Sequence, residues 1–496
     1  MVVQHNMQAA NANRMLNVTT SAQSKSTEKL SSGYRINRAA DDAAGLTISE
    51  KMRKQIRGLD QASTNAQDGV SSVQTAEGAL TEVHSMLQRM NELATQAANG
   101  TNSKDSDRQA IQDEIDQLTT EIDRVSETTK FNETYLLKGE AGTKTINMKA
   151  HDAGLKGKLT DNGDGTATFV MDTLNAGDKV SIGGKSYTIG SDDAEVDKWF
   201  TDNATDVADT AGKKVTVNGT EYTYADEVAA AGTAGKINKG WYAKTPTAPT
   251  DKTKETTPDF ANLDEIKTAV KKGATVQNGT KSITGMNDIA IPKDGVSDTD
   301  ATVISKNKAY ELASKELLKA NQIGDTENSA KVGVGTPTTT IDLTNGTGTF
   351  KIQTGSAKVA NSLSFSLHVG ADADMTNKIQ VNIDAMDSAS LGIKGLNVKD
   401  DSGNAATYAV DAISDAISKV SSQRSSLGAV QNRLEHTINN LDNVVENTTT
   451  AESRIRDTDM AKEMVNYSKN NILAQAGQSM LAQANQSNQG VLSLLQ

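Results

Sequence analysis

The five histidines are the first candidates for catalysis or metal binding, because imidazole can act near neutral pH as a general base or a metal ligand. A zinc peptidase helix of the His-Glu-x-x-His type would place two of them one helical turn apart. They are instead scattered along the chain, at His5, His84, His151, His368 and His436. No phosphate-binding loop or Ser-His-Asp order accompanies them, so we predict that the chain is not an enzyme and takes no cofactor.

A second candidate is the acidic, glycine-rich stretch DNGDG at residues 161–165. Carboxylates around a glycine are typical of calcium loops, but such a loop needs an ordered ligand spacing over about twelve residues, which this stretch lacks. Gly, Asn and Asp are also the residues that tight turns prefer. We therefore expect a hairpin turn, and no metal site, at residues 161–165.

Composition excludes several further classes of function. The absence of cysteine rules out disulfides and thiolate metal sites. A net charge of −12 argues against nucleic acid as a partner, since phosphate binding needs clustered Lys and Arg. No apolar run approaches the roughly 20 residues of a membrane helix, and residues 1–15 lack the pattern of a cleavable signal peptide. We expect neither nucleic acid nor membrane as a partner.

Long helices are the elements that remain to carry function. Apolar residues recur at steps of three, four or seven near both ends of the chain, while all five prolines and both tryptophans lie from Trp199 to Pro337. This spacing predicts one helix over about 52–99, a second over about 111–125 and a third over about 413–455, packed as a bundle. Their main apolar positions are Met52, Ile56, Leu59, Val70, Val73, Leu80, Leu87, Met90, Ile111, Ile115, Ile122, Ile413, Val420, Leu427, Leu434, Leu441 and Ile455.

The two extremities form a different kind of helix. Residues 470–496 contain no charged side chain and are rich in Gln and Asn. Their narrow apolar stripe favours packing against the N-terminal segment through Met15, Val18 and Ala22. One thin stripe on each helix cannot hold an isolated hairpin against ordering entropy, so we expect burial between copies of the chain. The candidate polymerisation residues are Met15, Val18, Leu473, Met480, Leu481, Val491 and Leu495.

Residues 141–361 have a β-rich pattern. Two stretches, at 180–188 and 215–223, place a turn pair, Gly-Gly or Asn-Gly, between alternating strands, and Asn278-Gly279 repeats the signal more weakly. A helix is expected over about 301–321, and a loop or linker over 245–258. The fold class is therefore a mainly α framework of long heptad helices from both termini, with a small β-hairpin element and an inserted β-rich α+β outer domain.

Several motifs at both ends closely resemble those of bacterial flagellins. They are LSSGYRINRAADDAAGL at 30–46, SLGAVQNRL at 426–434, SRIRDTDMA at 453–461 and QSMLAQANQ at 478–486. The likeness covers about residues 1–140 and 362–496. Within the first motif, Gly33 and Gly45 flank a polar segment, and we expect each to stop a helix.

The resemblance implies a domain plan. Residues 1–42 and 457–496 would form a terminal paired-helix polymerisation domain, and residues 43–140 and 362–456 a helical bundle domain with a β-hairpin. Residues 141–361 would form the inserted variable surface domain, in one or two subdomains.

The resemblance also implies function and partners. The chain would be secreted and would assemble with itself into the helical flagellar filament for swimming motility, which is an open, head-to-tail polymer. Further implied partners are the flagellar export apparatus, an export chaperone, the filament cap and the hook-junction proteins.

The chain departs from many relatives in one respect. Alternating residues at 363–369 and 379–383 predict a hairpin that resembles the β-element of the flagellin bundle. In many relatives this element directly follows the second helix, whereas here about 220 residues come first. The outer domain is therefore inserted before the hairpin.

A segment of the first long helix resembles the flagellin site that Toll-like receptor 5 recognises, with LQRMNEL at residues 87–93. Arg89 and Leu93 lie four residues apart, which predicts one shared helix face. Glu114 on the next helix stands at the matching motif position, and Gln88 adjoins Arg89. This chain has Asn91 at a position where some relatives have a second arginine. The alternative role of these residues is subunit packing inside the filament.

Two rival functions remain at the level of sequence. A flagellar hook-filament junction protein shares similar termini but would be present in few copies at the base of a filament. A secreted enzyme carried by the inserted domain would need a catalytic arrangement of residues, which the sequence does not contain. Growth of long filaments would distinguish the main subunit from both.

Overall fold

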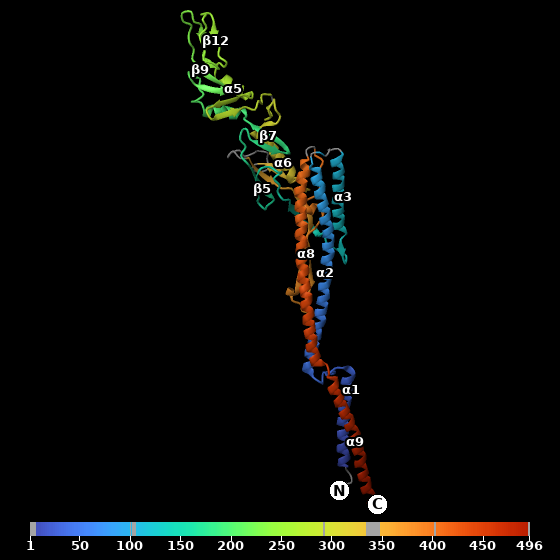
Figure 1. Cartoon of the computed structure of the whole chain (residues 1–496). Helices are drawn as coiled ribbons and strands as arrows, with labels where there is room; N and C mark the ends of the chain where they lie inside the picture. Colours follow the sequence, from blue (N-terminus) through green and yellow to red (C-terminus); the bar gives the residue numbers. More distant parts are fainter. Residues whose placement is uncertain are drawn as a thin grey trace. The chain divides into compact units, whose positions relative to one another are not determined.

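The computed structural model describes residues 6–99, 101, 106–290, 293–333, 348–400 and 403–494. The chain divides into two compact units. The terminal unit holds Met1–Thr75, Ser364–Asn382 and Ser425–Gln496, and the central unit holds Ala76–Leu363 and Ile383–Arg424. Two long helices, α2 (Ala43–Ala97) and α8 (Asn404–Arg456), contribute residues to both units (Figure 1).

In the terminal unit, helix α1 (Met7–Ser32) lies beside helix α9 (Met460–Leu494) (Figure 1). The Asn6 side chain caps the start of α1 by accepting a hydrogen bond from the Ala9 N–H. At its end Gly33 adopts φ 76°, and its N–H donates to the Lys29 carbonyl at 2.9 Å. This left-handed position favours glycine, so the expected helix stop at Gly33 is confirmed.

The same expectation is wrong for Gly45, which lies inside the first turn of α2. Its N–H donates at 2.8 Å to Oδ1 of Asp42, which caps the helix start. A Cβ at this position would come within 2.9 Å of Cδ1 of the buried Ile36. Gly45 is therefore a point of close packing between the start of α2 and the segment that connects α1 to α2.

A β-hairpin packs on the helices of the terminal unit. Strands β19 (Leu363–His368) and β20 (Lys378–Ile383) pair with each other, with the short helix η1 (Met375–Asn377) between them. Val369 and Ile379 form a core cluster with Ala66 of α2 and Leu434 of α8. The expected hairpin is confirmed, and so is its position after the insertion.

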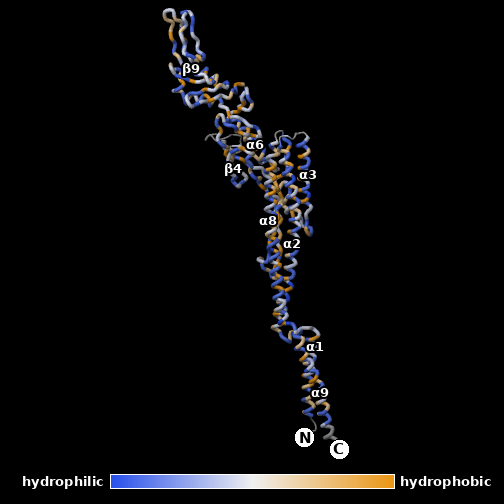
Figure 2. Tube along the Cα trace, viewed as in Figure 1, coloured by the Kyte–Doolittle hydropathy of each residue, from blue (hydrophilic) through white to orange (hydrophobic). Residues whose placement is uncertain are grey.

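The central unit contains the rest of the bundle. Helix α3 (Asp107–Thr128) follows α2, and Ile115 and Ile122 are fully buried, as are Leu87 of α2 and Val420 of α8. The three predicted long helices are thus confirmed, and hydrophobic positions recur along them (Figure 2). A small hairpin of β1 (Lys130–Phe131) and β2 (Thr134–Tyr135) comes next.

A two-stranded sheet brings the two ends of the insertion together. Strand β3 (Glu140–Asn147) pairs antiparallel with β18 (Ser356–Asn361), with Asn147 opposite Ser356. Met148 and Val359 pack there against Ala389 of the short helix α7 (Ser388–Leu391). The chain therefore leaves and re-enters the framework at one place, so that a long insertion leaves the bundle closed.

The first part of the insertion has a core of its own around helix α6 (Lys306–Asn321). A four-stranded sheet in the order β16-β17-β5-β4 packs there through Phe169 and Phe350 against Tyr310 of α6. A second sheet has the order β15-β7-β6. The strand bounds are β4 (Gly157–Asp161), β5 (Thr166–Met171), β6 (Lys179–Ile182), β7 (Lys185–Gly190), β15 (Val303–Ser305), β16 (Lys331–Gly333) and β17 (Thr349–Gln353).

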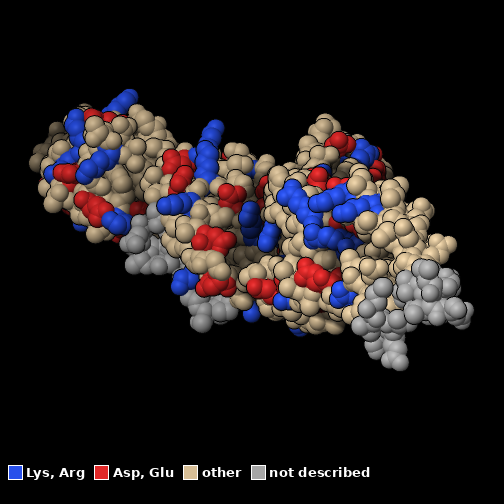
Figure 3. Space-filling view, turned by 90° about the horizontal axis from the view of Figure 1, so that it is seen from below, with Lys and Arg blue, Asp and Glu red and all other residues tan. Residues whose placement is uncertain are grey.

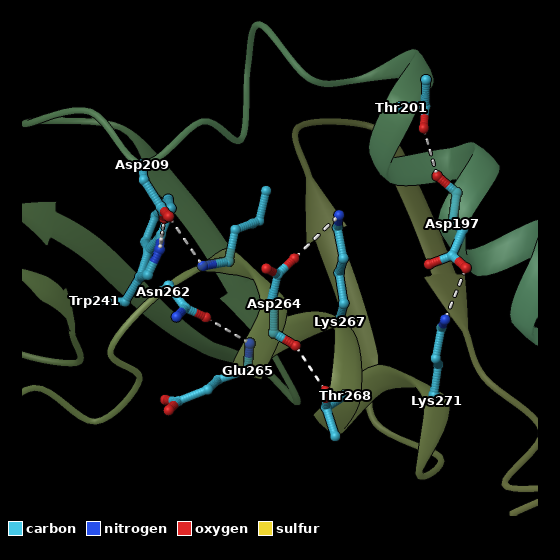
Figure 4. Close-up of polar contacts among 11 residues, drawn as sticks. Asp197, Thr201, Asp209, Trp241, Asn262, Asp264, Glu265, Lys267, Thr268 and Lys271 are labelled. Carbon is cyan, nitrogen blue, oxygen red and sulfur yellow. Dashed lines mark hydrogen bonds and ion pairs between the residues drawn. The ribbon is translucent and has the colours of Figure 1, made fainter.

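The second part of the insertion has a separate core around Trp241. Its five-stranded sheet, β11-β9-β8-β13-β14, packs against α4 and α5, and β10 pairs in parallel with β12. Figure 4 shows the Trp241 indole donating to Asp209 at 2.7 Å and Asn262 capping α5. The bounds are α4 (Asp193–Asp202), β8 (Lys214–Val217), β9 (Thr220–Ala225), β10 (Lys236–Ile237), β11 (Gly240–Tyr242), β12 (Glu255–Thr256), α5 (Leu263–Lys271), β13 (Thr275–Asn278) and β14 (Lys281–Thr284).

The expected turns and helix of the insertion are present. Gly183 and Gly184 join β6 to β7 with φ 56° and 70°, and Asn218 and Gly219 join β8 to β9 with φ 47° and 80°, as primed hairpin turns require. Residues 161–165 form the expected turn between β4 and β5. The helix expected over 301–321 begins at Lys306, because residues 303–305 form β15 instead.

We predict that Gly58→Ala destabilises the terminal unit by about 1–3 kcal/mol, the usual cost of overpacking. A Cβ on Gly58 of α2 would come within 3.1 Å of the Ala371 backbone in the hairpin. Gly428→Ala on α8 is the control, since nothing lies within 4 Å of its Cβ, and it should stabilise by about 0.5–1 kcal/mol. Urea unfolding followed by circular dichroism measures both. Equal effects would contradict this packing.

Candidate assembly and recognition surfaces

The antiparallel pairing of α1 with α9 uses a face of small and polar residues. Along α1 the residues turned toward α9 are spaced by three or four, as are those of α9, which is the spacing of a coiled-coil face. Asn6 Nδ2 donates to the Ala484 carbonyl at 3.2 Å, and Gln23 Nε2 to Asn471 Oδ1 at 3.4 Å. This pairing face consists of Ala9, Ala12, Leu16, Thr19, Ala22, Gln23, Ser26, Tyr467, Asn470, Asn471, Ala474, Gly477, Leu481 and Ala484.

Of the three N-terminal residues predicted to pack against the C-terminal stripe, only Ala22 is partly buried in the single chain. Burial between copies stays a prediction. Within one chain Met15 and Val18 do not pack against Leu473 and Met480 of the stripe. These four side chains are exposed, and Leu16 occupies the pairing face in place of its neighbour Met15. The reason is that Gly477 and Ala474 allow a close approach of the two helices, which larger residues would prevent. The Val491 side chain and all of Leu495 lie outside the described residues.

The sides of the two helices that are turned away from this contact carry large apolar residues among polar and charged ones. Val465 is 68% exposed and Met480 is 61% exposed. Monomeric proteins rarely leave so many large apolar residues open to water. The members of this outward face are Met7, Met15, Val18, Met464, Val465, Ile472, Leu473 and Met480.

A compact junction links the two segments that connect α1 to α2 and α8 to α9. Arg35 N donates to the Arg456 carbonyl at 2.6 Å, and Thr458 N to the Gly33 carbonyl at 3.0 Å. The Arg456 guanidinium stands 4.7 Å from the centre of the Tyr34 ring. It also pairs with Glu50 of α2 at 2.9 Å.

Sequence reasoning missed the junction, because its members are far apart in the chain. The available signal was Arg456, the second arginine of the motif SRIRDTDMA. The residues that it contacts could not be inferred from the spacing of the sequence. A neighbouring carboxyl, Asp41, accepts a hydrogen bond from the Arg38 N–H at 2.9 Å. This bond lowers the pKa of Asp41 below its ordinary value.

The candidate recognition surface lies in the central unit, on α2 and α3. Arg89 is half exposed, and its Nε donates to Glu114 at 2.9 Å, while a second nitrogen reaches Glu92 at 3.2 Å. The hydrogen bond that Arg89 donates to Glu114 raises the pKa of the Arg89 guanidinium above its ordinary value. Gln88 is exposed beside it and contacts His84 at 3.1 Å. The structure thus brings Gln88, Arg89 and Glu114 together.

Leu93 does not belong to this exposed group. Only 2% of its surface is exposed, and it lies in the bundle core with Met90. Arg89 and Leu93 are one turn apart on α2, as predicted, but the long Arg89 side chain reaches outward while Leu93 packs in the bundle core. Leu93 is therefore not exposed together with Arg89 in the single chain.

No metal site or membrane helix is found in the part of the chain that the structure describes. No group of three His, Asp or Glu residues there could hold an ion. Within the same residues, no helix combines the length and the hydrophobicity needed to cross a bilayer.

Comparison with known proteins identifies the family. Residues 3–142 match the model of the bacterial flagellin N-terminal helical region, and residues 410–495 match that of the C-terminal helical region. Flagellin of Clostridium tyrobutyricum is 38% identical over 492 residues, covering 99% of this chain and 100% of its own. Flagellin of Bacillus subtilis (strain 168) is 33% identical over 496 residues, covering all of both chains.

Among solved structures, FliC from Burkholderia pseudomallei matches 74% of this chain and 99% of its own at 19% identity, and its TM-score of 0.25 is too low for a comparison of folds.

The chain belongs to the bacterial flagellins. It is a structural subunit of the extracellular flagellar filament, it assembles with itself, and it is not an enzyme.

The absence of cysteine allows a direct test of the pairing face. An ideal Cβ on Gly477 lies 3.9 Å from Leu16 Cβ, which matches disulfide geometry. We predict that the double variant Leu16→Cys with Gly477→Cys forms an internal disulfide on mild oxidation, seen as a faster band in non-reducing electrophoresis. The control, Met15→Cys with Met480→Cys, should not. The opposite result would restore the stripe expected from the sequence.

Proposed function

We propose that the outward apolar face of α1 and α9 forms the contacts between copies in the filament. The observation that carries this proposal is the exposure of that face on a pair of helices whose shared face is small and polar. Burial of apolar surface stabilises by roughly 25 cal/mol per Å². Contacts between many copies would therefore supply the stabilising burial that a single α1–α9 pair does not have. The candidate polymerisation residues Met15, Val18, Leu473 and Met480 all belong to this face.

The domain plan remains part of the proposal. Residues 1–42 and 457–496 would polymerise, residues 43–140 and 362–456 would form the supporting bundle, and residues 141–361 would form the outer surface. The end of α1 at Ser32, the end of α8 at Arg456 and the pairing of β3 with β18 support these divisions.

We also propose further partners. A secreted filament subunit would need the flagellar export apparatus and an export chaperone, and the exposed apolar residues of its terminal helices suit a chaperone that shields them before assembly. At the two ends of the filament the same faces would meet the cap and the hook-junction proteins.

A second role, recognition of the monomer by Toll-like receptor 5, is supported by one observation. Arg89, Glu114 and Gln88 form an exposed polar group in which the guanidinium is held in place by two carboxylates. Arginine is frequent among residues that dominate binding energy at interfaces. Arg89 would be the anchor of this contact, and packing between copies in the filament would use the same surface.

We predict that Met480→Asp raises the critical concentration for filament growth at least about tenfold, because it buries a charge between copies. Met375→Asp is the control, since Met375 is an equally open methionine, 74% exposed, on η1 of the hairpin. Seeded elongation followed by light scattering measures both. If both variants elongated like the parent chain, the outward face would not be the polymer contact.

We predict that Arg89→Ala weakens binding of the monomer to the receptor ectodomain by about 1–3 kcal/mol. Arg124→Ala is matched to it, because Arg124 is an exposed arginine on α3 that pairs with Glu121 in the same unit. Surface plasmon resonance with purified monomer gives both affinities. An unchanged affinity for Arg89→Ala would remove this residue from the site.

A further inference from the structure

The charges of the terminal unit balance, whereas those of the central unit do not. The terminal unit carries 15 Lys and Arg and 15 Asp and Glu, out of 51 and 63 in the whole chain. The entire net charge of −12 therefore belongs to the central unit. Large net charge opposes the packing of identical molecules by repulsion. A neutral terminal unit can pack against further copies without this penalty.

Within the terminal unit the two signs are separated along the chain. Residues 1–57 contain nine basic residues (Lys and Arg) and four acidic residues (Asp and Glu). Residues 425–496 contain five basic and seven acidic residues. Figure 3 shows a group of Lys and Arg, bordered by Asp and Glu, on one face of the molecule. Such a separation makes a surface complementary to a second copy of itself.

The basic side has a continuous face on α2, formed by Lys51, Lys54 and Arg57. Steps of three residues keep these side chains within roughly 120° of the helix circumference, and all three are exposed. None of them makes an ion pair within the described residues. The nearby Glu50 already pairs with Arg53 at 3.4 Å and with Arg456 at 2.9 Å.

The acidic side has a face on α8, formed by Glu435, Asp442 and Glu446. Steps of seven and four residues place them on one side of the helix, and all are exposed. Their side-chain contacts in the described structure are neutral: Gln431 donates to Glu435 at 2.9 Å and Ser63 to Asp442 at 3.2 Å. No Lys or Arg of the described chain pairs with them.

The two faces do not satisfy each other within one copy. Ser49 contacts Glu452 and Ser63 contacts Asp442, so α2 and α8 run antiparallel at this level. The basic face thus lies level with the C-terminal end of the acidic face, yet no ion pair joins them in the described residues. The Asp442 side chain lies at the contact between the two helices, where it accepts the hydrogen bond from Ser63.

We propose that the basic face of one copy (Lys51, Lys54, Arg57) docks on the acidic face of a second copy (Glu435, Asp442, Glu446) in the filament. The contact is heterologous, since two different faces meet, and such contacts propagate into an open helix. This inference rests on the assembly role of the chain and adds an electrostatic contact to the apolar one. Opposite charges would set the register and speed of docking.

Charge reversal tests this contact. One variant carries Lys54→Glu with Arg57→Glu, and the other carries Glu435→Lys with Glu446→Lys. Each alone should elongate wild-type seeds at least about tenfold more slowly at low salt, with the difference shrinking at high salt because ions screen exposed charges. An equimolar mixture should recover elongation, because each altered face then meets a face of opposite sign.

The control reverses two exposed lysines of the central unit, Lys185→Glu with Lys239→Glu, which changes net charge equally. It should elongate like the parent chain. The proposal is overturned if the basic-face variant behaves like this control, or if the mixture elongates no better than either variant alone. Misfolding of one variant could not give recovery on mixing. Failure of the parent chain to elongate would count against assembly itself and not against this contact.

Discussion

The pairing of α1 with α9 through small and polar residues is the constraint on which the rest of the structure depends. Ala474 and Gly477 let the helices approach closely around Leu16, and most of the other large apolar residues of both helices stay exposed. A single chain therefore has no internal means of removing them from water. Contacts between copies solve this problem, and contacts between unlike faces extend without closing. The filament follows from an interaction that is incomplete within one subunit.

The rest of the structure holds the α1–α9 pair in place. The segments that connect α1 to α2 and α8 to α9 are joined by the contacts of Arg456 with Tyr34 and Glu50. These contacts fix the two connections relative to each other. The bundle is closed by buried apolar positions along α2, α3 and α8. The β3 and β18 pairing then confines the insertion to a single exit point. Variation in the insertion can therefore leave the assembling unit unchanged.

Much of the fold could be predicted from the sequence, for identifiable reasons. Heptad spacing fixed the long helices, and glycine-containing turn pairs fixed the hairpins, because both signals are local. Spacing could not decide between Met15 and Leu16, since adjacent apolar residues fit the same stripe equally well. It also placed Leu93 beside Arg89, although burial depends on neighbouring helices. Gly45 and the Arg456 junction depend on contacts between distant segments, which a single sequence does not display.

The amides of the terminal helices should differ in protection between the dilute monomer and the assembled filament. Amide hydrogen exchange, read by mass spectrometry, should show rapid exchange throughout α1 and α9 in dilute monomer, while the buried stretches of α2 and α8 stay protected. In assembled filaments α1 and α9 should become as protected as the bundle. Full protection of both terminal helices in the dilute monomer would contradict the claim that they need other copies to be stable.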